Sequence, residues 1–76
     1  MSASLDQLKP GQKARIQSMT GEPSLLQRLM EMGLLEGEVV EVVSFAPLGD
    51  PMEIRLRDYR LSLRRREAAC IAVAIV

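Results

Sequence analysis

The side chains that could perform chemistry in this sequence are few. It contains no histidine and one cysteine, Cys70. A nucleophile would therefore have to find its general base in a carboxylate or a lysine, and no such pairing stands out. Cys70 precedes the apolar run 71–76, where a thiol is more often a small packed hydrophobe than a reactive thiolate. The sequence thus predicts no catalytic residues and no enzyme activity.

Carboxylates remain as candidate ligands for a divalent cation. Those considered are Glu22, Glu31, Asp50 and Glu53. Their spacing matches no metal-binding loop, and without histidine the usual zinc sites lack most of their ligands. The five glycines form neither of the common phosphate-binding motifs. We therefore expect no metal site, no cofactor and no nucleotide bound by the chain itself.

Basic side chains are concentrated in the last third of a chain with no net charge. Residues 1–54 hold four basic and eight acidic groups, whereas residues 55–76 hold six arginines and two acids. Four arginines alternate with apolar residues and should form one basic patch on the outward faces of adjacent strands. They are Arg55, Arg57, Arg60 and Arg64.

The basic patch has two interpretations. The simpler one is a solvated surface. The alternative is nucleic-acid binding, because small barrels bind single strands by combining basic grooves with aromatic side chains that stack on bases. Phe45 and Tyr59 are the only aromatic residues, which weakens this alternative.

A loop of restricted shape joins two predicted strands at residues 46–51. Pro47 and Pro51 limit its backbone, and Gly49 relaxes it. Leu48 should stand at its tip. Either Leu48 folds back to close one end of a barrel, or the loop presents it to a pocket of a partner. Both interpretations stay open at this point.

Short strands must position these candidates. Polar–apolar alternation and β-branched residues predict four strands, and a largely apolar segment predicts a fifth. They cover residues 13–19, 38–45, 52–57, 60–64 and 70–76. Asp58 and Tyr59 would form the tight turn between the third and the fourth.

One amphipathic helix is expected at about residues 24–32, because Ser24 and Gln27 fit a capping box ahead of apolar positions. Gly33 then stands where a helix often ends in a left-handed residue. Residues 65–69 can form only one helical turn. So small a sheet would leave its edges exposed if it stayed open, so we expect a mainly β fold, a five-stranded SH3-like barrel with the helix at one side.

The chain of 76 residues lies near the lower limit for one hydrophobic core, so we expect a single domain over residues 1–76. Residues 1–9 do not have the charged and apolar regions of a signal peptide. The longest apolar run, 71–76, is far shorter than the roughly 20 residues that cross a bilayer as a helix. We expect a cytoplasmic protein without direct membrane insertion.

Three segments in order resemble the FeoA family of bacterial ferrous iron transport proteins. They are residues 32–37 (MGLLEG), 46–51 (APLGDP) and 61–64 (LSLR), within a match that runs from about Leu5 to Val76. The resemblance implies an SH3-like fold, a cytoplasmic location and action with FeoB, the membrane permease whose cytosolic G-protein domain handles GTP. Within the family, partner contact is ascribed to the barrel surface. The resemblance thereby indicates as partner-binding candidates Met32, Gly33, Pro47, Leu48, Gly49, Asp50 and Pro51.

The resulting hypothesis is an accessory protein of ferrous iron uptake that docks on the cytosolic region of a FeoB-type permease. It would change transport by assembly or by biasing a switch in the GTPase. An open strand edge could also pair with a second copy in a weak homo-oligomer. Two alternatives are a nucleic-acid-binding small barrel that uses the arginine patch and a sensor that binds ferrous iron through carboxylates.

Overall fold

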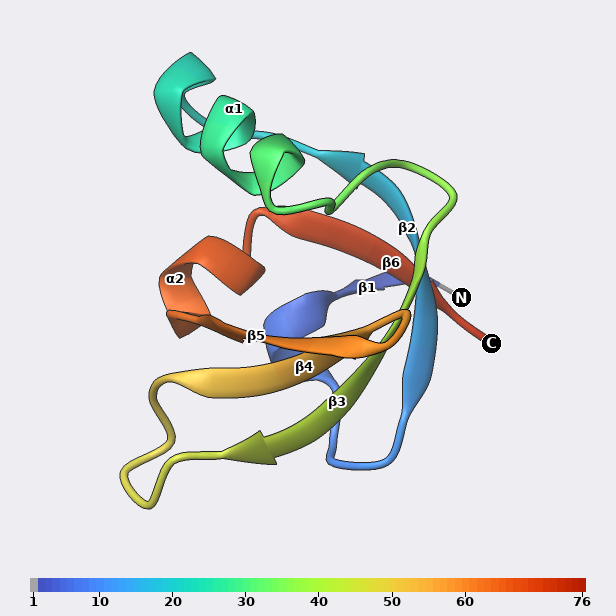
Figure 1. Cartoon of the computed structure of the whole chain (residues 1–76), viewed down its shortest axis with the longest axis vertical. Helices are drawn as coiled ribbons and strands as arrows, with labels where there is room; N and C mark the ends of the chain where they lie inside the picture. The colour runs from blue at the N-terminus through green and yellow to red at the C-terminus, as the bar shows by residue number, and fades with distance from the viewer. Residues whose placement is uncertain (1) are drawn as a thin grey trace.

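The computed structural model describes residues 2–76, which form six strands, two α-helices and one 3-10 helix (Figure 1). The strands are β1 (Ser2–Ser4), β2 (Lys13–Met19), β3 (Val39–Phe45), β4 (Met52–Leu56), β5 (Tyr59–Leu63) and β6 (Ile71–Ile75). The helices are η1 (Leu5–Gln7), α1 (Pro23–Glu31) and α2 (Arg65–Ala68). The mainly β fold with one short helix and one further helical turn confirms the predicted class.

The six strands form one antiparallel sheet in the order β1-β6-β2-β3-β4-β5. The pairing register shifts between Ile16 and Ser18 on β2 and between Val42 and Ser44 on β3. Such bulges bend a strand and increase its twist. The sheet therefore curls around its own inner face, and β1 and β5 remain as its two edges.

The core lies inside this curl and follows the predicted alternation. On β4, for example, Met52, Ile54 and Leu56 are buried while Arg55 is exposed. Leu29 of α1 is also fully buried and belongs to the same core. Burying one such aliphatic side chain contributes about 1.5–3 kcal/mol. Packing of these apolar side chains is thus the main contribution to the stability of the fold.

Helix α1 begins one residue earlier than predicted. Pro23 occupies its first turn and Glu22 is the N-cap residue, with φ −68° and ψ 145°. The expected capping box of Ser24 and Gln27 is therefore wrong, because the fixed φ of proline suits the first helical position and sets the start there. Gly33 follows the helix with φ +95°, as its position in the sequence predicted.

Two features of the sheet differ from the sequence prediction. The strand count of five was one short, because β1 pairs with β6 through Ser2 and Ala74. The tight turn lies at Arg57 and Asp58 rather than one residue later, since Leu56 pairs with Tyr59 and Arg57 adopts φ +58°. Arginine rarely takes this conformation, so sequence patterns favour a different turn.

The two helices lie on the same side of the molecule, away from the chain ends (Figure 1). Helix η1 contacts α2, which brings the N-terminal segment against the end of β5. The molecule measures 30 × 25 × 24 Å. Within residues 2–76, no helix has the length and apolar character needed to cross a membrane.

Candidate functional site

The segment between β3 and β4 forms a short loop with an exposed tip. The Ala46 N–H donates to the Pro51 carbonyl at 2.9 Å, and the Gly49 N–H donates to the Ala46 carbonyl at 2.7 Å. The second bond closes a turn with Pro47 in its second position and glycine in its fourth, which are the positions that such turns favour for these residues. Leu48 is 97% exposed. The interpretation in which Leu48 folds back into the barrel is therefore wrong.

Arg65, the first residue of α2, holds this loop in place. Its backbone N–H donates to the Asp50 carboxylate at 3.0 Å, and its guanidinium lies 5.2 Å from the centroid of the Phe45 ring. The same guanidinium donates to the Asp6 carbonyl of η1 at 3.2 Å. A cation over an aromatic ring contributes about 0.5–1 kcal/mol at an exposed site. One arginine thus connects the loop, the end of β3 and the N-terminal segment.

The end of α1 lies against the start of β5. The Tyr59 hydroxyl donates to the Met32 carbonyl at 3.0 Å. A Cβ atom on Gly33 would lie 2.5 Å from the Tyr59 hydroxyl oxygen and 3.1 Å from the Leu56 Cδ2. Glycine is therefore required here twice, by its positive φ and by the close approach of the tyrosine.

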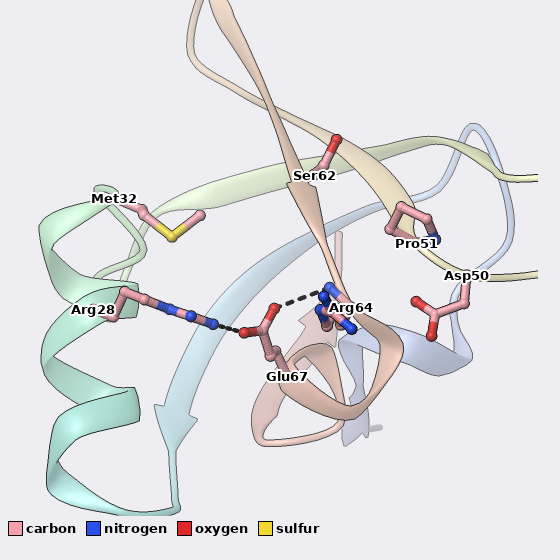
Figure 2. A pocket seen from close by; sticks show the side chains of 7 residues that line it. All are labelled: Arg28, Met32, Asp50, Pro51, Ser62, Arg64 and Glu67. Atoms are coloured by element: carbon pink, nitrogen blue, oxygen red, sulfur yellow. Dashed lines mark hydrogen bonds and ion pairs between the residues drawn. The ribbon is translucent and has the colours of Figure 1, made fainter.

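A groove of about 570 Å³ opens between α1, the start of β4, β5 and α2 (Figure 2). It is lined by Arg28, Met32, Asp50, Pro51, Ser62, Arg64 and Glu67. One methionine and one proline supply apolar surface, and the other five residues supply hydroxyl or charged groups. This mixture fits recognition of a polypeptide better than it fits an enclosed apolar ligand.

Glu67 links α2 to α1 at the bottom of the groove. Its carboxylate is largely buried, accepts a hydrogen bond of 3.0 Å from the Arg64 N–H, and forms an ion pair with Arg28. Figure 2 shows both contacts as dashed lines. The Arg28 side chain is 57% exposed, so solvent screens part of this attraction. The pair holds the helix at a fixed distance from β5 without closing the groove.

The structure places the predicted partner-binding residues in three different places. The groove is lined by Met32, Asp50 and Pro51. The tip of the loop holds Pro47, Leu48 and Gly49, and Gly33 lies in the turn after α1 against Tyr59 and Leu56.

Sequence reasoning missed Arg28, Ser62 and Glu67. Glu67 stands three residues after Arg64, the N-cap residue of α2, and this spacing indicates a capping contact. The sequence contains no comparable signal for Arg28 or Ser62, because their place in the groove depends on contacts between distant parts of the chain.

Three of the four arginines in the predicted basic patch are paired with carboxylates. Arg55 lies 3.7 Å from Glu41, and Arg60 lies 3.5 Å from Glu53. A carboxylate oxygen of Glu38 lies 2.7 Å from the guanidinium of Arg57. The outward face of β4 and β5 therefore carries mixed charge, and Arg64, which directly follows β5, lines the groove together with Ser62. This arrangement weakens the nucleic-acid alternative, which needs unpaired cations to neutralise phosphates.

Within residues 2–76, the pair of Glu38 and Arg57 is the one place where a pKa departs clearly from its ordinary value. The hydrogen bond from Arg57 lowers the pKa of Glu38, and the same contact raises the pKa of Arg57. The Arg57 side chain is largely exposed, and the Glu38 side chain is partly covered. The pair connects the start of β3 with the turn after β4.

The carboxylates considered as metal ligands lie in separate surroundings. Asp50 accepts a hydrogen bond from the Arg65 N–H, Glu53 pairs with Arg60, and Glu31 accepts a bond from Gln27. Across residues 2–76, no three acidic, histidine or cysteine side chains are grouped so as to hold a metal ion. Cys70 is partly buried, and its thiol contacts the Arg66 carbonyl at 3.5 Å.

A family comparison covers nearly the whole chain. The FeoA domain model matches residues 3–75. A curated relative, the Fe(2+) transport protein A/Fe(2+) transporter FeoB fusion protein of Porphyromonas gingivalis, is 40% identical over 72 residues. The match covers 95% of this chain but only 8% of that protein. The chain thus corresponds to a small part of the fusion protein.

Solved structures agree with the fold. The FeoA protein of Chlorobium tepidum is 42% identical with a TM-score of 0.91, and the match covers 97% of this chain and 70% of that one. Stenotrophomonas maltophilia FeoA, solved with zinc and described as a prokaryotic SH3 domain protein, is 28% identical with a TM-score of 0.82. That match covers 95% of this chain and 89% of the other. The SH3-like class predicted from the sequence is confirmed.

Proposed function

The chain belongs to the FeoA family, and from this premise we propose that it is a cytoplasmic accessory protein of ferrous iron uptake that binds the cytosolic region of a FeoB-type permease. The fusion protein of Porphyromonas gingivalis supports this partner, because there a FeoA-like segment and a FeoB transporter belong to one polypeptide. Such a fusion makes an association between the two parts permanent.

The observation that carries the proposal is the exposed Leu48 on a held loop. The Leu48 side chain is 97% exposed. Its transfer from water into an apolar pocket of a partner would contribute about 1.5–3 kcal/mol to binding if the side chain became fully buried. The two hydrogen bonds inside the loop and the contacts of Arg65 limit its motion. A loop that is already ordered loses little conformational entropy on binding.

In this proposal the chain contributes a surface and performs no reaction. A module of this kind affects a transporter by binding one of its conformations better than another, or by bringing its copies together. Either effect would change the rate of GTP hydrolysis or of iron uptake. The GTP-dependent chemistry would belong to the permease.

A capture assay with the isolated cytosolic region of the permease tests the proposal. We expect the natural chain to be captured and Leu48→Asp to lose most of its affinity, because a carboxylate cannot enter an apolar pocket without a partner. Val76→Asp is the matched control, since Val76 is another exposed apolar residue, at 69% exposure, outside the loop. Unchanged capture of a folded Leu48→Asp variant would contradict the role of the loop.

A further inference from the structure

Strand β5 is an edge of the sheet with unused backbone groups. It pairs only with β4, and the register joins Leu56 to Tyr59 across a two-residue turn. In an antiparallel pair of this register, alternate residues direct their N–H and C=O groups away from the neighbouring strand. On β5 these are Arg60 and Ser62. No hydrogen bond from another element in residues 2–76 reaches their backbone groups.

The groove runs along this open edge. Helix α1 faces β5 across it and is held there at two points, by the bond from Tyr59 to Met32 and by the ion pair of Arg28 with Glu67. Ser62, which follows Tyr59 on β5, lines the groove (Figure 2). An added strand would lie about 4.8 Å from β5. The open backbone and the groove therefore coincide.

Both carboxylates in the groove lining already have partners, Glu67 in Arg28 and Asp50 in the Arg65 N–H, so the arginines beside the edge favour an acidic occupant. The Arg64 side chain lines the groove and has no carboxylate partner in residues 2–76. Arg60 is 55% exposed and pairs with Glu53 only at 3.5 Å. If β5 paired with β5 of a second copy, Arg60 and Arg64 of both copies would gather on one face of the new pair, and like charges close together across a strand pair are destabilising. An extended segment with acidic side chains avoids this repulsion.

We propose that the groove binds an extended segment of a partner protein, which pairs with β5 as an additional strand and alternates acidic with apolar side chains. Successive side chains of a strand point to opposite faces. Those on the face of Ser62 would meet Arg60 and Arg64, and those on the other face would meet α1 and Met32. The inference deepens the proposed function and rests on it only for the identity of the partner.

A titration with two short capped peptides tests the mode of binding. One alternates glutamate with valine and the other alternates lysine with valine. We expect only the glutamate peptide to bind and to slow amide hydrogen exchange at Arg60 and Ser62. The slowing should be roughly tenfold when nine-tenths of the chain is occupied, because only the unoccupied tenth then exchanges freely. Equal binding of both peptides, or protection that spares both amides, would overturn the proposal.

Substitutions at the edge separate backbone pairing from side-chain contact. Ser62→Pro removes the outward N–H and should abolish peptide binding, whereas Ser62→Ala keeps that N–H and should still bind the peptide.

Arg64→Glu tests the side-chain contact. It should weaken the affinity for the glutamate peptide by at least about tenfold and allow the lysine peptide to bind. Lys9→Glu makes the same charge change in the turn before β2, outside the groove, and should have little effect. Tight binding of the glutamate peptide to Arg64→Glu would contradict the inference even if Ser62→Pro did not fold.

The same exchange measurement with the cytosolic region of the permease distinguishes this inference from the proposed function. Capture that depends on Leu48 but leaves the Arg60 and Ser62 amides unprotected would keep the proposed function and overturn the strand addition. Peptide protection of these amides without capture of the permease region would support the strand addition and overturn the proposed partner.

Discussion

The hydroxyl group of Tyr59 donates a hydrogen bond of 3.0 Å to the main-chain carbonyl of Met32, so the first residue of β5 is tied to the end of α1. This bond sets one end of the groove. Because Met32 follows the last turn of the helix, its carbonyl has no partner within α1. The tyrosine therefore satisfies a backbone acceptor and fixes the helix at the same time.

Tyr59→Phe removes this hydrogen bond and keeps the ring. Tyr59 is 41% exposed, so water can replace the lost donor, and we expect the free energy of unfolding to fall by only about 0.5–1.5 kcal/mol. Amide exchange in the last turn of α1 should become faster. Urea denaturation and hydrogen exchange measure the two effects, and unchanged exchange in α1 would show that the bond does not hold the helix.

Gly33→Ala should be much more disruptive than the same change at Gly37. Both glycines have similar positive φ values, +95° and +91°. An added Cβ would meet Tyr59 and Leu56 at Gly33, but it meets nothing within 4 Å at Gly37. We expect Gly37→Ala to cost about 1 kcal/mol for backbone strain and Gly33→Ala about 1–3 kcal/mol more. Equal losses in denaturation experiments would mean that the tyrosine moves aside freely.

The ion pair of Arg28 and Glu67 should contribute more to stability than the surface pair of Arg55 and Glu41. Glu67 is largely buried, whereas Arg55 and Glu41 are 3.7 Å apart and both partly exposed. Double-mutant cycles should give a coupling energy of about 1 kcal/mol or more for the first pair and less than about 0.5 kcal/mol for the second. Glu67→Gln is the preferred change, since its amide oxygen can still accept the Arg64 N–H. Similar couplings for both pairs would contradict the bridging role of Glu67.

Stability should depend on pH through Glu38. The hydrogen bond from Arg57 lowers the pKa of Glu38 in the folded chain. The stabilising contribution is therefore fully present above the pKa of the unfolded chain and is lost as the pH falls through the lower pKa of the folded chain. The denaturation midpoints of the natural chain and Glu38→Gln should differ at neutral pH and converge in acid. A difference that grows in acid would contradict this assignment.

The regular strands could be predicted because their side chains carry local signals. Ile54 and Leu56 alternate with charged residues, and Val40 and Val42 are β-branched residues that become fully buried on β3. Strand β1 has no such signal. Its small residues form a strand only because β6, from the other end of the chain, lies beside them.

The candidate site was predictable only in part for the same reason. The loop could be located from Pro47, Gly49 and Pro51, whose conformational limits are local. Arg28 and Ser62 come from distant segments and meet in the groove only after the sheet has curled. The start of α1 depended on whether Pro23 or Ser24 set it, a choice between two local signals of similar strength.

The pairing of β1 with β6 has a consequence for any tethered partner. It places both chain ends on one side of the molecule, opposite α1 and α2 (Figure 1). A tether from either end must cross much of the 25 Å width of the molecule to reach the groove (Figure 1). A flexible linker has that average span at roughly 20 residues. Much shorter tethers would lower the effective concentration of the partner at the groove. In a fused protein, the length of the linker would therefore control how often the groove is occupied, without any change in the contact surface.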